Sequence, residues 1–486
     1  MKSVEKKMPP MAWLVFAVVW MAVPSSAINL NQDSLTVDEV IARVECKGWP
    51  GHDYALYIPK KSLALEDPPV LFVLDPAARG EFALRRFQAA ASRWGVIVAA
   101  SNSSRNGPVG DVVSAIRAMW QDFKKRMGLE PKVIYAAGFS GGARASAYFS
   151  RAIGRPVTGI IACGAGLSPL IKVSGLETSF YCGIAGYDDF NYREMRRLDA
   201  SLDKVALPHH FIHGPFDHRW PEIRTCERAL GWLIFRSAKA RLLYLPEFSA
   251  REFLENEITE LENARRRGDT LRVAREASTL LSPAEESRQY PQISKLLKTT
   301  LKSKMYRSMA RKEARLARRE ERLLSEAGRV FNRLEKGDAD AADLPGITLR
   351  LGISGLRRQA LHTYKDRMVA AMARRVLNSI GVEASHRGIQ HQVGKKRLKL
   401  AMRYYDIVTA CGKPIHLQAL TLYNSACIYA LWGRYKAAMQ RLDRAVIAGF
   451  RNLTHLKQDP DLAGLRSQPE FSSAMKQWQK LLDEES

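Results

Sequence analysis

Short apolar runs alternate with amphipathic stretches through the first half of the chain. The apolar runs, which we expect to form buried strands, are residues 54–58, 70–74, 96–100, 133–137, 159–163, 180–183 and 210–213. The stretches between them that have helical spacing are residues 82–94, 112–126, 143–153, 192–202 and 221–236. This alternation is typical of a mostly parallel sheet covered by helices. It predicts an α/β domain over residues 50–245, with connections too short for a large lid inserted in the sheet.

The pattern changes after Pro246 to Arg, Lys, Glu, Ala and Leu at helical intervals. We therefore expect an all-α second part, which begins with a basic helical region over residues 246–400. Residues 294–335 predict one long amphipathic helix or a pair of helices. Residues 337–355 are rich in Asp, Gly and Pro and predict a break between helices.

Residues 401–486 contain a pattern of small and aromatic positions, clearest over residues 422–449. This pattern resembles a tetratricopeptide repeat, with Gly433 in the turn between two closely packed helices. A single repeat cannot bury its own apolar face, so helices upstream must complete the core. The resemblance implies that the helical tail binds a protein or peptide partner.

The N-terminus has the features of a secretory signal peptide. Lys2, Lys6 and Lys7 precede the apolar run 11–23, and small residues at 25–27 suit cleavage. We expect residues 1–27 to be removed, residues 28–49 to form an N-terminal segment, and the protein to be periplasmic or extracellular. The alternative is an uncleaved N-terminal anchor.

The six cysteines and the ten histidines show no metal-binding spacing. There is no CxxC pair and no histidine cluster at zinc spacing, so we expect no metal site and no cofactor. Export would permit disulfides, but six cysteines allow many pairings and the sequence assigns none. Most are expected to be small buried residues.

The net charge of +25 is concentrated in the helical part, where residues 251–400 hold 33 Lys and Arg against 19 Asp and Glu. A solvated charged helix face is the usual explanation. An anionic envelope surface is a second candidate partner. Nucleic acid is disfavoured, because no recognised binding module is visible and an exported chain rarely meets it.

The strongest chemical motif is Gly138-Phe139-Ser140-Gly141-Gly142, which follows the strand-like run 133–137 and opens a helical stretch. A nucleophile on a sharp strand-to-helix turn needs small residues on either side, because side chains there would collide with the neighbouring backbone. We therefore predict that Ser140 is a nucleophile. The alternative is a glycine-rich turn that only connects two elements or binds phosphate.

A serine nucleophile needs a base, and the base needs an acid, which in this kind of fold follow in the order Ser, acid, His. The acid is expected at the end of the run 180–183, where Asp189 is the first choice and Asp188 the reserve. Either could instead cap the next helix. His218 lies in the loop after the last strand and is the predicted base, with His213 as its rival.

Residues 50–238 resemble the α/β-hydrolase superfamily, and within it secreted esterases related to polyhydroxybutyrate depolymerases, feruloyl esterases and dienelactone hydrolase-like proteins. The resemblance rests on the elbow at Ser140, the acid loop Gly-x-x-Asp-Phe-Asn at Asp189 and the His-x-Trp-Pro loop at His218. Such proteins usually have two glycines before the base, where this chain has Phe216 and Asp217.

The resemblance implies two backbone donors for the oxyanion, which are Gly141 after the nucleophile and Ala77 in the loop after the run 70–74. A lipase-type His-Gly-Gly-Gly run is absent from the sequence. Arg79 and Arg144 are candidate pocket residues for an acidic substrate, but solvation at the surface is the explanation that we favour.

These features together predict an exported serine hydrolase that cleaves a small or polymeric carboxylic ester through an acyl-enzyme. A serine peptidase of the same fold is the close alternative, because ester and amide cleavage use the same triad. A scaffold with little turnover, which binds a partner through its helical tail, is the alternative of a different class.

Overall fold

The computed structural model describes residues 35–337, 343–393, 397–412 and 415–484. The predicted signal peptide, residues 1–27, lies outside the described residues. Within the described ranges, none of the helices combines the length and the apolar character needed to cross a membrane.

The described N-terminal half is built on an eight-stranded sheet with the order β1-β2-β4-β3-β5-β6-β7-β8. Strand β2 pairs antiparallel with β1 and β4, and all other pairs are parallel. The strands are β1 (Val40–Glu45), β2 (Asp53–Tyr57), β3 (Val70–Leu74), β4 (Ile97–Ser101), β5 (Ile134–Phe139), β6 (Val157–Cys163), β7 (Thr178–Gly186) and β8 (His209–Gly214).

Each of the seven apolar runs coincides with one of the strands β2 to β8, and β1 is the strand that the apolar pattern missed. Strand β1 lies at the edge of the sheet, and only one of its six residues is buried. An edge strand with so little buried surface has no continuous apolar run to reveal it.

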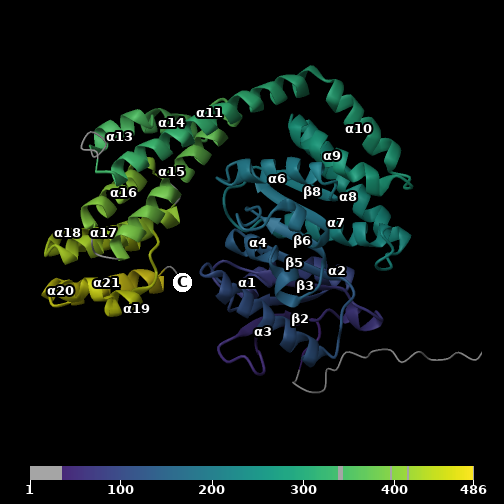
Figure 1. Ribbon diagram of the computed structural model, residues 1–486, viewed down its shortest axis with the longest axis horizontal. Helices are drawn as coiled ribbons and strands as arrows, with labels where there is room; N and C mark the ends of the chain where they lie inside the picture. Colours follow the sequence, from purple (N-terminus) through teal and green to yellow (C-terminus); the bar gives the residue numbers. More distant parts are fainter. Residues whose placement is uncertain (1–34, 338–342, 394–396, 413–414, 485–486) are drawn as a thin grey trace, which may run out of the picture.

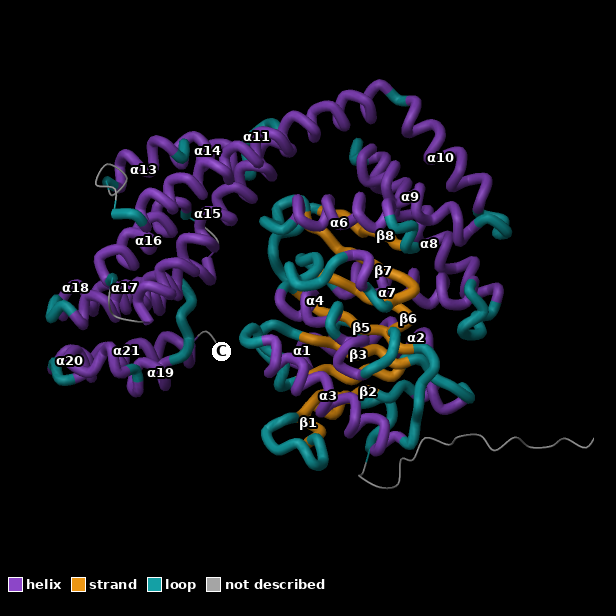
Figure 2. Tube along the Cα trace, viewed as in Figure 1, coloured by secondary structure: helices purple, strands orange, loops and turns teal. Residues whose placement is uncertain are grey.

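Helices cover both faces of the sheet and form two apolar cores (Figure 2). One face carries α1 (Gly80–Arg85), α2 (Gln88–Trp94) and α7 (Ile223–Lys239). The other carries α3 (Val109–Met127), α4 (Gly141–Ser146), α5 (Phe149–Ile153) and α6 (Tyr192–Lys204). The helical stretches of the sequence are therefore present, with two of them divided by a turn.

Every described element after α7 is helical, and the first of these helices extend the core of the sheet domain. Helices α8 (Glu247–Arg266), α9 (Thr270–Ala284) and α10 (Tyr290–Lys302) contribute Phe253, Val273 and Ile293, respectively, to the same apolar cluster as α7. Residues 245–246 therefore mark a change of secondary structure and not a break in packing. All six cysteines are buried and free, as expected for small interior residues.

Beyond α10 the chain forms a helical arm that passes over the sheet domain and then lies beside it (Figure 1). The predicted helix or helical pair over residues 294–335 is a pair, because Ser303 ends α10 and caps α11 (Lys304–Glu335) with its side chain. The other helices are α13 (Leu344–Arg350), α14 (Ile353–Ala360), α15 (Arg367–Val393), α16 (Leu398–Cys411), α17 (Ile415–Leu431), α18 (Tyr435–Ile447), α19 (Leu453–Gln458), α20 (Ala463–Arg466) and α21 (Pro469–Glu484).

The predicted break over residues 337–355 was too long, since α13 and the start of α14 lie within it. Asp343 and Pro345 are the reason: the Asp343 side chain accepts a hydrogen bond from the N–H of Gly346, and Pro345 stands in the first turn, so both residues start α13. Residues that look like loop markers in sequence act here as a helix start.

Candidate active site

Ser140 stands at the sharp turn between β5 and α4, with φ 52° and ψ −116°. A non-glycine residue in this left-handed region is strained and is held there by its surroundings. A Cβ on Gly138 would lie 2.2 Å from the carbonyl oxygen of Gly142, and one on Gly142 would lie 2.0 Å from that of Leu74. The two glycines are therefore required by the close approach of strand, turn and helix.

Ser140, His218 and Asp189 form one hydrogen-bonded chain. The distance from Ser140 Oγ to His218 Nε2 is 2.8 Å, and His218 Nδ1 lies 3.0 Å from each carboxylate oxygen of Asp189. Asp189 is 1% exposed, and its Oδ1 also accepts the N–H of Asn191 at 2.8 Å. The three predicted residues, which come from the ends of β5, β7 and β8, thus meet at one edge of the sheet.

The unusual residues before the base are accommodated by the neighbouring acid loop. The carbonyl of Phe216 accepts the N–H of Asp188, and the Phe216 carbonyl oxygen would lie 2.1 Å from a Cβ placed on Gly186. The rings of Phe139 and Phe190 pack on the imidazole of His218 at 4.8 and 4.2 Å. The base loop is therefore fixed by packing, without the two glycines that the resemblance led us to expect.

The rival residues do not meet Ser140. The reserve acid, Asp188, pairs with Arg374 of α15 at 2.9 Å. His213 is 1% exposed and packs among Tyr187, Tyr192 and other aromatic rings, where burial lowers its pKa to about 3. Of the candidates for acid and base, Asp189 and His218 are thus the two that are linked to Ser140 by hydrogen bonds.

The buried carboxylate of Asp75, just after β3, gathers several donors. It accepts the indole N–H of Trp220 at 2.7 Å, a two-pronged hydrogen bond from Arg79 and the N–H of Ala77 at 2.8 Å. Burial would raise the pKa of Asp75, but these hydrogen bonds outweigh it and hold the pKa below its usual range. The N–H of Ala77 is therefore already donated, contrary to the expectation that it is available for an oxyanion.

Asn106 lies beside the other expected donor, Gly141. A Cβ on Gly141 would fall 1.7 Å from Asn106 Oδ1, so the side-chain amide packs directly against the turn after Ser140. Asn106 is held by its own N–H, which donates to the Pro76 carbonyl at 2.8 Å. The amide thus lies on the same side of Ser140 as the Ala77 loop.

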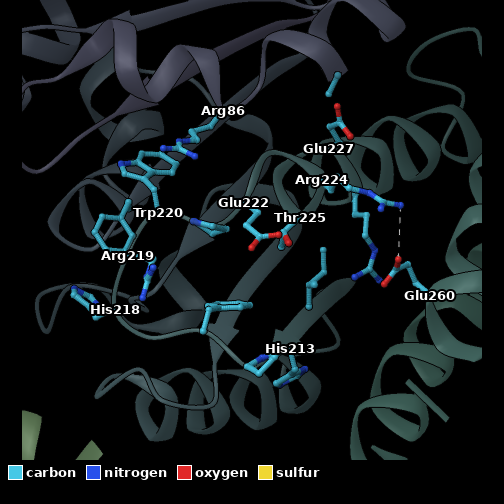
Figure 3. A pocket seen from close by; sticks show the side chains of 18 of the residues that line it. Arg86, His213, His218, Arg219, Trp220, Glu222, Arg224, Thr225, Glu227 and Glu260 are labelled. Atoms are coloured by element: carbon cyan, nitrogen blue, oxygen red, sulfur yellow. Dashed lines mark ion pairs between the residues drawn. The ribbon is translucent and has the colours of Figure 1, made fainter. Parts of the chain in front are cut away.

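A cavity of about 1360 Å³ leads away from Ser140 and His218 (Figure 3). Arg86 and Trp220 line it near the triad, and Glu260 of α8 lines it at the other end, where it pairs with Arg224. Of the two arginines named from the sequence, Arg79 lines the cavity while bound to Asp75. Arg144 instead pairs with Glu194 at 2.8 Å.

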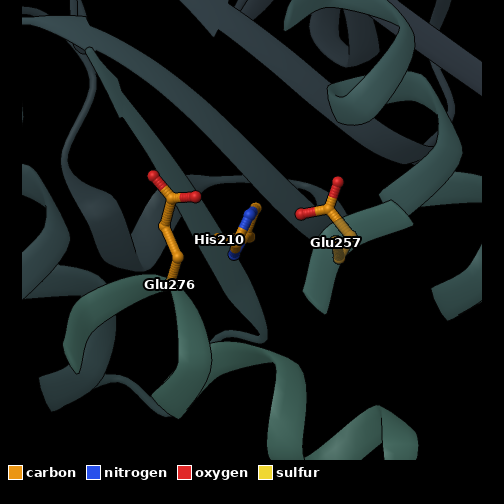
Figure 4. A group of neighbouring side chains, drawn as sticks. All are labelled: His210, Glu257 and Glu276. Carbon is orange, nitrogen blue, oxygen red and sulfur yellow. The ribbon is translucent and has the colours of Figure 1, made fainter. Parts of the chain in front are cut away.

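A group of metal-capable side chains lies at the wall of this cavity, which Glu257 lines, and the carboxylates of Glu257 and Glu276 flank the ring of His210 (Figure 4). Arg228 pairs with Glu257 at 2.7 Å and with Glu276 at 2.8 Å, and Arg272 pairs with Glu276 at 2.9 Å. Burial would raise the pKa of Glu276, but the two guanidinium groups lower it to about 2. Two arginines thus neutralise two glutamates, which makes this a buried ion-pair network between the sheet and α8–α9. We call it the buried charge cluster.

Several residues around the site were not identified from the sequence. Asp75 and Trp220 could have been found, because an acid at a strand end and an indole beside the base are local signals. Arg374 and Arg375 of α15 reach the acid loop from more than 180 residues away in the sequence, and no local signal marks them.

Comparison with protein-family models and with curated proteins found no match. Among solved structures, an S-formylglutathione hydrolase of Staphylococcus aureus is 14% identical, with a TM-score of 0.32, and is covered over 98% of its chain by 41% of this one. A serine hydrolase of Xanthomonas campestris is 17% identical, with a TM-score of 0.33, over 96% of its chain and 42% of this one. Esterase B of Lactobacillus rhamnosis is 13% identical, with a TM-score of 0.33, over 90% of its chain and 42% of this one.

Similarities this low carry no argument about activity, so the conclusion on the fold rests on the topology itself. The sheet begins with an antiparallel strand pair, continues with parallel strands crossed by helices, and bears a strained serine between β5 and α4. The N-terminal half of this chain has the α/β-hydrolase fold, and an all-helical part follows it.

Proposed function

We propose that this protein is a serine hydrolase that cleaves carboxylic esters through an acyl-enzyme on Ser140. The observation that carries the proposal is the chain of hydrogen bonds from Ser140 to His218 and from His218 to Asp189, at 2.8 and 3.0 Å. An unassisted serine hydroxyl is a weak nucleophile, and this arrangement supplies the base that activates it.

In the proposed reaction, Ser140 Oγ attacks the ester carbonyl carbon while its proton passes to His218 Nε2. Asp189 accepts the Nδ1–H bond, orients the ring and stabilises the imidazolium. The tetrahedral intermediate then expels the alcohol, which takes the proton from His218 and leaves an acyl group on Ser140. Water, deprotonated by His218, hydrolyses this acyl-enzyme and restores the serine.

For the oxyanion we propose the N–H of Gly141 together with the side-chain amide of Asn106. Gly141 opens α4, and the first N–H groups of a helix have no acceptor within that helix. Ala77, the other donor expected from the sequence, would first have to release Asp75. Asn106→Ala should lower kcat about a hundredfold, the usual loss for one oxyanion donor.

A fluorophosphonate probe tests the proposed nucleophile. Wild-type protein should be labelled and Ser140→Ala should not, whereas Ser168→Ala, a half-buried serine bonded to Tyr148, should be labelled like wild type. Folded wild-type protein that resists the probe would refute the enzyme and favour the scaffold. A panel of p-nitrophenyl esters and peptide amides then separates an esterase from a peptidase of the same mechanism.

The cavity supports an ester with a bulky acyl or alcohol group, small or part of a polymer. Its volume of about 1360 Å³ exceeds what a short ester fills, and α8 supplies much of its far wall. Turnover should therefore persist for p-nitrophenyl esters with long or branched acyl chains. A sharp loss beyond acetate and butyrate would contradict this view of the cavity.

We also propose that the protein is exported, with residues 1–27 removed, and that its helical tail binds a protein or peptide, or an anionic envelope surface. The support is the N-terminal sequence pattern and the basic composition of residues 251–400. N-terminal sequencing of the protein from envelope fractions tests the first point. The salt dependence of binding to envelope polymer tests the second, because a charge-driven contact weakens steeply with salt.

A further inference from the structure

We propose that helix α15 is a positioning element for the acid of the triad, acting through Arg374 and Arg375 on the loop that carries Asp189. This inference rests on the proposed function and deepens it. It gives the helical part a role in turnover itself, besides any partner that the tail binds.

Arg374 holds the residue next to the acid. Its guanidinium pairs with Asp188 at 2.9 Å and also donates to the carbonyl of Ala360 at 2.8 Å, which ties the acid loop to α14 and α15 together. The Arg374 and Asp188 side chains are 22% and 16% exposed. This pair is therefore partly shielded from water, and it fixes the direction in which Asp188 points, away from the triad.

Arg375 holds the loop one residue earlier. Arg375 donates to the carbonyl oxygen of Tyr187 at 2.6 Å, and it also donates two hydrogen bonds to the carboxylate of Glu320 on α11. The Arg375 and Glu320 side chains are 7% and 2% exposed. A charge pair this deeply buried keeps one geometry, because any other arrangement would leave a buried charge without its partner.

Two tyrosines at the ends of the same loop are also held by the helical part. The hydroxyl of Tyr187 donates to Asp269, the residue that caps α9, at 2.6 Å, and that of Tyr192 donates to Glu313 of α11 at 2.8 Å. The loop between them carries Asp189. Four attachments of this loop thus come from α9 with its cap, α11 and α15, all of which follow the sheet in the chain.

The acid depends on this loop for its position. Asp189 is held by the backbone N–H of Asn191 and by its own N–H, which donates to the carbonyl of Gly186 at 3.1 Å. Asn191 belongs to the loop that α15 holds, and Gly186 is the last residue of β7, directly before that loop. A shift of the loop by about 1 Å would therefore displace the carboxylate from His218 Nδ1, and a misplacement of that size can cost about a hundredfold in rate.

Two variants test the inference by weakening the attachment without touching the triad. Arg374→Gln removes the charge that holds Asp188. Because Arg375→Gln alone would leave Glu320 buried without its partner, it is combined with Glu320→Gln. Arg387→Gln is the matched control, since Arg387 lies on the same helix but pairs with Glu383 and Glu335 of the helical part.

The readout is kcat per active site on the best p-nitrophenyl ester, with active sites counted by fluorophosphonate titration. We expect each test variant to lower kcat roughly tenfold or more with KM within about twofold. Arg374→Lys should recover part of the loss, and Arg387→Gln should match wild type.

A purely structural role would reduce the number of active sites and leave kcat per site unchanged. That outcome would overturn the inference while leaving the proposed function intact. If wild-type protein is not labelled at Ser140, the proposed function fails first. The two failures are thus distinguishable in one set of measurements.

Discussion

Two of the three histidines of β8, His210 and His213, should make the protein sensitive to mild acid. His210 and His213 are both 1% exposed, and burial lowers the pKa of each to about 3. Neither ring nitrogen of His213 has a hydrogen-bond partner within the described part of the chain. Arg275 and Arg196 face it and oppose its protonation, whereas Glu276 and Asp199 favour it.

The sign and size of the change in stability follow from the linkage between proton binding and folding. A histidine whose folded pKa is depressed contributes stability that is fully present above its unfolded pKa of about 6.5 and is lost as the pH falls. Between pH 7 and pH 5 each such histidine should lower the free energy of unfolding by about 2 kcal/mol, or about 4 kcal/mol for both. Glu276, whose folded pKa is about 2, adds to the loss only below about pH 4.5.

Urea unfolding at pH 7, 6 and 5, followed by tryptophan fluorescence, measures this loss. His213→Phe should lower the difference in unfolding free energy between pH 7 and pH 5 to about half of the wild-type value. The control is His362→Gln, because the His362 side chain is exposed and the substitution should leave the pH dependence unchanged. Equal pH dependence in wild type and His213→Phe would refute the reasoning, whatever the absolute stability of the variant.

Three further substitutions have defined expectations. Arg228→Met removes the guanidinium that pairs with both glutamates of the buried charge cluster, and it should lower the free energy of unfolding in urea at pH 7 by about 3–5 kcal/mol. A decrease below about 1 kcal/mol would mean that Arg272 alone neutralises the cluster. Gly142→Ala places a Cβ 2.0 Å from the carbonyl oxygen of Leu74. This variant should not be labelled by the fluorophosphonate even when circular dichroism shows that it is folded, and normal labelling would show that the turn can relax. Trp220→Phe removes a 2.7 Å hydrogen bond to the buried carboxylate of Asp75 and should lower the free energy of unfolding by about 1.5–3 kcal/mol. An unchanged melting temperature would mean that this hydrogen bond does not stabilise the fold.

Most of the sheet domain was predictable, because its signals are local. Buried parallel strands are continuous apolar runs, and seven of them coincide with β2 to β8. Strand β1 was missed, since an edge strand with one buried residue lacks that signal. The turn at Ser140 could be placed because glycines are required where strand, turn and helix approach closely, and that requirement is visible in five consecutive residues.

The surroundings of the triad could be predicted only in part. The spacing Gly-x-x-Asp favoured Asp189, but the sequence could not exclude Asp188, because the two carboxylates are adjacent and chemically identical. Their difference is decided by Arg374, which takes Asp188 out of reach of the base. In the same way, the N–H of Ala77 is not free to bind an oxyanion, because it donates a hydrogen bond to the buried carboxylate of Asp75.

The sequence by itself therefore determined the order of the elements, the turn that carries Ser140 and the candidates for acid and base. Only the tertiary structure decided which candidates meet, how α8 walls the cavity and how α15 holds the acid loop. The physical reason is that secondary structure follows from sterics and periodicity over a few residues. The contacts that orient a site arise where helices distant in the sequence pack against the sheet, and no local pattern records that packing.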